Sequence, residues 1–400
     1  MRLASRKTGR RARSVIDPEM PVCGIEAEFD LLCDGVRVLP EDFFGGILKV
    51  LPDARIPWRG KPVTLPNGCI AYFDRGVIEV ATPPIVLAAG APAISVALLN
   101  AGIRWVRNGL DRWQRQNNRV LRLRGFSAHY NFSFVRSRRN SARTLDQLAF
   151  TLCHILPFPG ILVATNARSR SVGVRPRINR LEVTIDYTVE PVRMAAMAAL
   201  VFGVLGEAMS WRTYRLAEAE RRQLPLLSNF RPRPHTSRNG WLAHIDCFTS
   251  NPFNPDTRHI GWQTKAHGVL TIRQISTRIV QHFRGAIKRY SSPSVLRCIN
   301  EIIERNDGDQ AGARGSGHYH DVRGGRSSIN QHTKGIETYY ARVFCRVTRA
   351  ERFFHGDRQF VPIRIVDWFA IAVLDQRTRK IETWSLDDIA RCYSRLRRPT

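Results

Sequence analysis

The chain has 400 residues, of which 43% are hydrophobic and 24% are charged. This balance excludes global disorder and suffices for two domains, or for one large domain with an appendage. The formal net charge is +28, and the seven lysines leave 55 arginines among the 62 basic residues. Such a surplus indicates a polyanionic partner, although arginine-rich amino-acid usage without any binding role would give the same count.

The eight cysteines are scattered without a C-x-x-C pair, and several sit in apolar runs. This spacing argues against a cysteine-based zinc site and favours reduced, buried thiols in a cytoplasmic protein. Residues 1–18 show no secretory hydrophobic stretch and are rich in arginine, so we expect them to form a disordered basic tail. The apolar run at 194–206 is shorter than about 20 residues, so it predicts a buried core helix and no membrane span.

Hydrophobic periodicity predicts an α+β protein whose strands and helices are not interleaved one for one. The expected strands of the first half, in chain order, are 22–32, 69–74, 77–82, 119–135 and 180–186. The expected helices are 41–51, 92–117, 144–155 and 191–222. Residues 52–68, which contain four prolines, and residues 225–262 are expected to be loop-rich.

The second half is expected to contain mostly helix over 264–305, with a break near Ser291 and Pro293. Residues 306–335 are polar and glycine-rich, which is typical of a flexible loop. Residues 336–400 alternate in a pattern that predicts a small β-rich C-terminal domain, closed by a helix at 386–396. The main domain is then expected to span 19–305.

Four of the expected strands carry polar residues on one face, because residues two apart on a strand point the same way. These pairs are Glu26 and Glu28, Asp74 and Glu79, His129 and Asn131, and Arg180 and Glu182. Oxygen ligands with one imidazole suit Mg²⁺ or Mn²⁺, and an arginine opposite them suits phosphate. Alternating charge is equally compatible with a solvated outer face, but four such pairs in consecutive strands with apolar neighbours favour a phosphoryl-transfer site.

Two stretches of sequence resemble a known family. G-I-E-A-E-F at 24–29 resembles the G-x-E-x-E opening of carboxylate–amine ligases of the glutamine-synthetase-like fold. N-G-C-I-A-Y-F-D-R-G-V-I-E-V-A-T-P-P at 67–84 resembles, more specifically, a block shared by the ligase and the depupylase (deamidase) of Pup, the prokaryotic ubiquitin-like protein. Tyr72, Asp74 and Glu79 occupy its matching positions.

Weaker matches extend this resemblance over roughly residues 22–190. H-Y-N at 129–131 is similar to the family's His-x-Asn segment, with Tyr130 where the Pup enzymes carry Glu. Arg180 falls near the position of the family's phosphate-binding arginine. W-Q-T-K at 262–265 is a fainter match to a Trp-x-x-Lys of the same branch.

The resemblance implies a curved antiparallel sheet that cradles ATP, with helices behind it and a small C-terminal domain. It implies that Asp74 is the catalytic acid–base residue. The implied Mg²⁺ ligands are Glu26, Glu28, Glu79 and His129. The implied nucleotide-binding residues are Arg180, Tyr72 and Asn131.

In such a ligase, ATP phosphorylates the side-chain carboxylate of the modifier, and a target lysine attacks the acyl phosphate to form an isopeptide bond. The related depupylase hydrolyses that amide. An acidic Pup-like modifier and lysine-bearing target proteins are therefore the expected partners, and they rank above nucleic acid as the explanation for the positive charge.

Two alternatives remain at the level of sequence. The first keeps the fold but joins a small amino acid or peptide to an amine, as glutamate–cysteine ligase does. The second is a non-catalytic, arginine-rich nucleic-acid-binding protein, which the charge and the basic tail would support. Against it, the chain lacks interleaved aromatic and basic stacking motifs and any known nucleic-acid module.

Overall fold

The structure is a computed structural model that describes residues 21–51, 62–134, 142–177, 179–236, 239–303, 339–366 and 370–393. The basic tail expected at 1–18 and the glycine-rich loop expected at 306–335 lie outside these residues. Most of the proline-rich segment at 52–68 does too. The proposed domain limits at 19–305 and 336–400 stay predictions.

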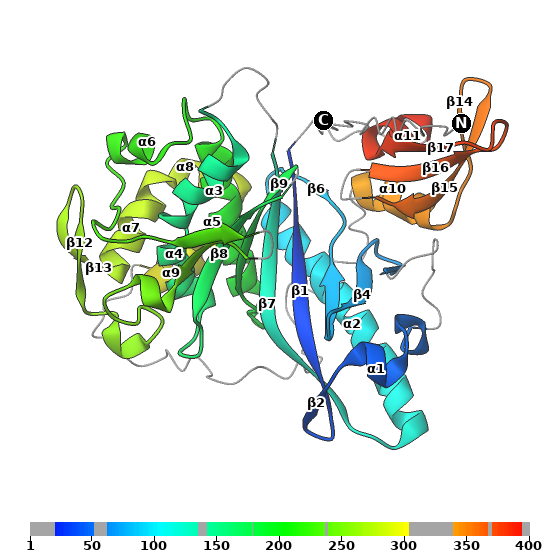
Figure 1. Cartoon of the computed structure of the whole chain (residues 1–400), viewed down its shortest axis with the longest axis horizontal. Coiled ribbons are helices and arrows are strands. Elements are labelled where there is room, and N and C mark those ends of the chain that lie inside the picture. Colours follow the sequence, from blue (N-terminus) through cyan, green and yellow to red (C-terminus); the bar gives the residue numbers. More distant parts are fainter. Residues whose placement is uncertain are drawn as a thin grey trace, which may run out of the picture.

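One large antiparallel sheet organises the main part of the molecule (Figure 1). Its strand order is β10-β11-β8-β9-β7-β1-β5-β4-β3, with β2 and β6 also paired to β1. The strands are β1 (Val22–Cys33), β2 (Val36–Val38), β3 (Val63–Thr64), β4 (Ile70–Asp74), β5 (Val77–Ala81), β6 (Ile85–Val86), β7 (Leu121–Ser133), β8 (Ser171–Pro176), β9 (Arg180–Asp186), β10 (Arg233–Thr236) and β11 (Gly240–His244). The expected α+β class with a large antiparallel sheet is therefore confirmed.

Helices cover one face of this sheet. The helices before the C-terminal part are α1 (Pro40–Phe44), α2 (Ala91–Asn117), α3 (Leu145–Cys153), α4 (Pro157–Ala164), α5 (Pro191–Ala208), α6 (Leu216–Arg221), α7 (Ile272–His282), α8 (Arg284–Tyr290) and α9 (Pro293–Ile303). α2 packs against β1, β5 and β7, whereas α3 and α4 pack against β8 and β9. Along β1, Ile25, Ala27 and Phe29 are at most 1% exposed and join this core, so Glu26 and Glu28 point to the opposite face.

α5 lies at the centre of the helical layer. It is the only helix of the described ranges that is long and apolar enough by itself to cross a membrane, and 72% of it is buried inside the protein. α3 and α4 pass the same test only as a pair, bent by 59°. The burial of α5 confirms the prediction of a core helix at 194–206.

The single helix expected at 191–222 is wrong, because α5 ends at Ala208 and α6 begins at Leu216. Trp211 and Tyr214 between the two helices are almost fully buried. The apolar residues of the sequence therefore continue through a segment in which the backbone is not helical. α4 and β8 were not predicted, and β10 and β11 form a hairpin where only loops were expected. Described cysteines are all free, as expected from their spacing.

The C-terminal part has a separate sheet of four antiparallel strands in the order β14-β15-β16-β17. Its elements are α10 (Tyr339–Thr348), β14 (Phe353–His355), β15 (Arg358–Ile365), β16 (Ala370–Asp375), β17 (Ile381–Ser385) and α11 (Leu386–Cys392). The extended pattern expected from 337 is wrong at α10. Val343, Phe344 and Val347 are buried on one helical face, because residues three and four apart meet there.

A short hairpin of strands, β12 (Gly261–Thr264) and β13 (Gly268–Thr271), precedes α7 and stands apart from both sheets. Trp262 and Lys265, which carry the faint family match, belong to it and to its turn. Trp262 is 5% exposed and contacts the ring of Phe248, whereas Lys265 forms an ion pair with Glu220. Both residues therefore have local packing roles in this hairpin.

Candidate active site

The register of the central strands brings the predicted residues into rows across one face. Glu26 on β1 lies opposite His129 on β7, and Glu28 lies opposite Glu79 on β5. Glu79 in turn lies opposite Tyr72 on β4. Two carboxylates directly opposite each other destabilise a sheet unless a cation or a proton compensates them.

His129 lies between three carboxylates. Its Nδ1 is 3.4 Å from Glu26 Oε2 and 3.9 Å from Glu182 Oε1, whereas its Nε2 is 3.8 Å from Glu28 Oε1. Ligand atoms of Glu26, His129 and Glu182 all lie within 4.8 Å of one another. Glu79 completes the group from β5, and Tyr72 forms a hydrogen bond with it. We call Glu26, Glu28, Glu79 and His129 the acidic cluster.

The acidic cluster shifts the proton affinities of its members in opposite directions. Burial disfavours the charged form of Glu26, but its hydrogen bond to His129 and the charge of Arg180 outweigh this and lower its pKa. Burial and the charge of Glu26 raise the pKa of Glu79. Burial opposes the charge of His129, yet the surrounding glutamates raise its pKa to about 9. When no metal is bound, protons on Glu79 and His129 therefore neutralise part of the negative charge of the acidic cluster.

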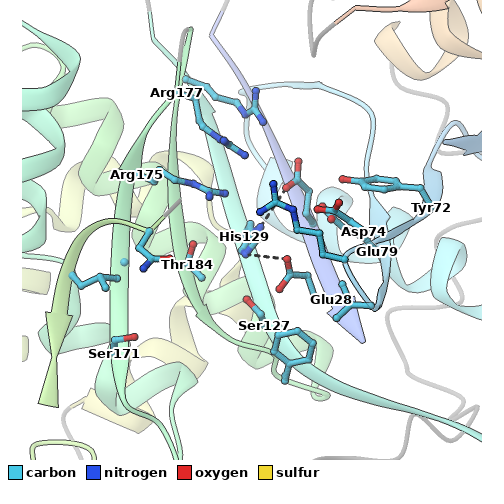
Figure 2. A pocket seen from close by; sticks show the side chains of 18 of the residues that line it. Glu28, Tyr72, Asp74, Glu79, Ser127, His129, Ser171, Arg175, Arg177 and Thr184 are labelled. Atoms are coloured by element: carbon cyan, nitrogen blue, oxygen red, sulfur yellow. Dashed lines mark hydrogen bonds and ion pairs between the residues drawn. The ribbon is translucent and has the colours of Figure 1, made fainter. Parts of the chain in front are cut away.

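Arginines face the acidic cluster from the neighbouring strands β8 and β9 (Figure 2). Arg175 and Arg177 both pair with the buried Glu182, the second through Nε at 3.1 Å from Oε2. Arg180 Nε donates a hydrogen bond of 2.8 Å to Asn131 Oδ1. Asn131 is 1% exposed, so it holds Arg180 from beneath the surface of the site.

Asp74 lies at the rim, where β4 turns into β5. Arg75 and Gly76 form the two-residue turn with φ of 49° and 89°, the pattern of a type I′ hairpin. Only glycine adopts such angles without cost, which explains Gly76, whereas Arg75 takes the left-handed conformation at some cost. The turn leaves Asp74 exposed to solvent on the same side as Tyr72 and Glu79 (Figure 2).

These residues line one open pocket of about 740 Å³. Of the eight residues predicted from the sequence, seven line it, and the eighth, Asn131, supports Arg180 from below. The lining residues predicted from the sequence are Glu26, Glu28, Tyr72, Asp74, Glu79, His129 and Arg180.

Sequence reasoning missed four of the lining arginines, and two of them, Arg175 and Arg177, pair with Glu182. Arg175 does alternate with apolar residues in S-V-G-V-R-P, and this was the only local signal. Glu182 was placed on the polar face, but its pairing with these arginines was not foreseen. Five arginines line this pocket beside its carboxylates. They are Arg37, Arg75, Arg175, Arg177 and Arg180.

The acidic cluster fits a hard divalent cation by its chemistry. Carboxylate oxygens with one imidazole are ligands that Mg²⁺ and Mn²⁺ accept. Burial and the neighbouring charge of Glu26 raise the pKa of Glu79, so a cation beside it would favour its ionised form. A cation there would replace the protons that otherwise neutralise the site.

Comparison with known proteins gives a match in structure alone. No profile of a known protein family matches this chain, and no curated protein sequence does. Among solved structures, the crystal structure of the prokaryotic ubiquitin-like protein Pup with its ligase PafA is similar with a TM-score of 0.51. The identity is 14%, over 93% of this chain and 92% of that one. A structure of PafA in complex with ADP matches at 13% identity and a TM-score of 0.48, over 89% of this chain and 93% of that one.

The first match covers nearly all of both chains, so it concerns the whole architecture, including the small C-terminal sheet. This chain therefore has a Pup-ligase-like fold of the glutamine-synthetase-like type, as the resemblance in sequence had led us to expect.

Proposed function

We propose that this protein is an ATP- and Mg²⁺-dependent carboxylate–amine ligase that acts on a Pup-like protein modifier. The observation that carries the proposal is the arrangement within one pocket. The acidic cluster lies on β1, β5 and β7, and arginines lie beside it on β8 and β9. Phosphoryl transfer requires a site for a divalent cation next to a site for phosphate.

In this proposal, Glu26, Glu28, Glu79 and His129 hold Mg²⁺, which supplies positive charge against the phosphate oxygens. Arg180 binds phosphate, and its bond to Asn131 fixes the guanidinium in the direction of the pocket. Holding these charges in place before the reaction lowers the cost of the negative charge that develops during transfer.

Asp74 would take the proton of the attacking amine. A lysine amine is protonated near pH 7, so a carboxylate base must be within reach before the nitrogen can attack. The exposed position of Asp74 at the rim suits a base that meets a lysine on a second protein, because a large partner cannot enter a closed cavity. Activation of the modifier carboxylate by phosphorylation supplies the leaving group.

The modifier is inferred from the fold and the charge together. The structural relative is the ligase of Pup, a protein modifier. The net charge of +28 suits an acidic partner of that kind. The reverse reaction class, amide hydrolysis by a depupylase-like enzyme, would use the same pocket and is therefore an outcome of the same experiment.

The experiment supplies Mg-ATP, a Pup-like tail ending in Glu or Gln, and a lysine-bearing target, and follows masses. A conjugate of tail and target supports the ligase, whereas conversion of Gln to Glu supports the amidase. If neither occurs but a small amino acid is coupled to an amine, the glutamate–cysteine-ligase-like alternative replaces both. If tight, salt-dependent binding of RNA or DNA is the sole activity, the proposed enzyme is refuted.

The matched variants are Asp74→Asn and Asp256→Asn. We expect Asp74→Asn to reduce turnover by about 10²- to 10⁴-fold while nucleotide affinity is retained, since a general base contributes that much. Asp256 is exposed and lies outside the pocket, so its variant should turn over normally. Wild-type turnover by Asp74→Asn would remove the assigned role.

A further inference from the structure

Arg75 differs from the other arginines that line the pocket in its surroundings. Its side chain is exposed, and it forms no ion pair or side-chain hydrogen bond with any residue that the structure describes. Its charge is therefore available to a ligand, whereas each of the other four arginines is already held by a neighbour. Their partners are Asp30 for Arg37, Glu182 for Arg175 and Arg177, and Asn131 for Arg180.

The turn between β4 and β5 fixes the backbone of Arg75 at the rim of the pocket. The backbone N–H of Gly76 donates to both carboxylate oxygens of Glu41 on α1, at 3.0 and 3.1 Å. A Cβ on Gly76 would lie 2.7 Å from Leu39 Cδ2, so the turn packs closely against the start of α1. Arg75 directly follows Asp74 in this turn. Its side chain therefore starts from a fixed point beside the proposed base.

The place of Arg75 in the sheet indicates which anion it meets. Four strand-to-strand steps of about 4.8 Å lie between β4 and β9, the strand that carries Arg180. Arg75 is therefore at the end of the pocket opposite to the proposed phosphate site. The carboxylate that accepts the phosphoryl group must lie next to that phosphate site, so it lies inward of the rim. The group that passes Arg75 is the lysine of the target protein on its way to Asp74.

We propose that Arg75 is a specificity-determining residue that favours target lysines with an acidic side chain beside them. The inference rests on the proposed function, in which Asp74 meets that lysine. A guanidinium at the exposed rim attracts a carboxylate on the target and repels a second cation there. Because both charges stay in contact with water and salt, this effect ranks target lysines by rate and excludes none of them.

The test uses three peptides that each contain one lysine, flanked by two glutamates, two glutamines or two arginines. Wild type, Arg75→Gln and Arg75→Glu receive Mg-ATP and the Pup-like tail, and kcat/KM for each peptide is measured from the masses of the conjugates. We expect wild type to prefer the glutamate peptide to the glutamine peptide about two- to fivefold, the range of an exposed ion pair. The arginine peptide should be disfavoured by a similar factor. Arg75→Gln should lose most of the preference, and Arg75→Glu should reverse it.

Arg379 provides the matched control. It is exposed in the turn between β16 and β17, and its φ of 57° gives it the same left-handed conformation as Arg75, but it does not line the pocket. Arg379→Gln and Arg379→Glu should therefore keep the wild-type order of the peptides. The preference of wild type should also shrink between about 0.05 M and about 0.5 M salt, because the Debye length falls.

Three results would overturn the inference. They are equal kcat/KM for the three peptides in wild type, the wild-type order of peptides in both Arg75 variants, and a weaker affinity of Arg75→Gln for ADP or for the Pup-like tail. The last would assign Arg75 to the nucleotide or to the modifier. The first needs no variant, so it decides even if an Arg75 variant does not fold. All three leave conjugation itself intact, whereas a wild-type protein that conjugates none of the peptides refutes the proposed function.

Discussion

Asp186, at the end of β9, should be a source of pH-dependent instability. Its Oδ2 accepts hydrogen bonds from Ser169 Oγ and from Asn166 Nδ2, the latter at 2.9 Å. Burial disfavours its charge more than these two bonds favour it, so its pKa rises from 3.8 to about 6. A raised pKa in the folded state stabilises the protein below the unfolded pKa, and this contribution disappears as the pH rises through about 6.

The magnitude follows from the shift of roughly two pH units, which corresponds to about 3 kcal/mol once both states are ionised. By the same linkage, the loss is about 1 kcal/mol at pH 4.5, since the carboxyl of the unfolded chain is already mostly ionised there and that of the folded chain is not. Asp186→Asn cannot ionise, and its amide oxygen can accept the same two hydrogen bonds. We therefore expect it to be more stable than wild type by up to about 3 kcal/mol at pH 7.5.

The assay is urea unfolding followed by tryptophan fluorescence at pH 4.5 and pH 7.5. Asp256→Asn serves as the matched control, and it should differ from wild type by less than about 0.5 kcal/mol at both pH values, because it is exposed. A destabilised Asp186→Asn at pH 7.5 would refute the reasoning. An advantage of the same size at both pH values would refute it equally, since the effect could then not arise from titration.

Two further predictions concern the metal and the helix packing. Mg²⁺ or Mn²⁺ at about 100 times its dissociation constant should stabilise wild type by about 2.7 kcal/mol, seen as a higher melting temperature. Glu79→Gln should lose most of this rise in melting temperature. The control Glu301→Gln changes an exposed residue and should keep the rise. An equal rise in both variants would contradict the metal assignment. Gly203→Ala should destabilise the protein by about 1–3 kcal/mol, because its Cβ would lie 2.7 Å from Ile287 Cα, where α5 crosses α8. Gly285→Ala meets nothing within 4 Å and should be neutral or stabilising in the same melting experiment, so a loss there would point to a general intolerance of α8.

The acidic face of the sheet was predictable because strand geometry is local. A side-chain period of two places Glu26 and Glu28 on one face whatever their partners are. The Arg75-Gly76 pair likewise marks a tight hairpin from its own sequence, and this hairpin fixes Asp74 and Glu79 relative to each other. The resemblance to Pup enzymes then indicated that the polar residues of these separate strands belong to one site.

The arginine side was not predictable in the same way. Arg175 and Arg177 enter the site because β8 pairs with β9, and no local pattern specifies which strands become neighbours. Nor does net charge say where charges lie, so four of the five arginines that line the acidic pocket, all except Arg180, were not among the predicted site residues. α10 was missed for another reason: its aromatic and β-branched residues favour strands by propensity, and packing against α11 overrode it.

The position of β1 has a consequence for how the chain reaches its folded state. β1 is made early, yet Glu26 meets His129, its partner on β7, 103 residues later. Val22, at the start of the same strand, belongs to the core of the C-terminal part, together with Val343 and Phe360. During synthesis, the strand that carries half of the acidic cluster must wait for partners that are made later, from β7 to the C-terminal part, so the site should be among the last features to form.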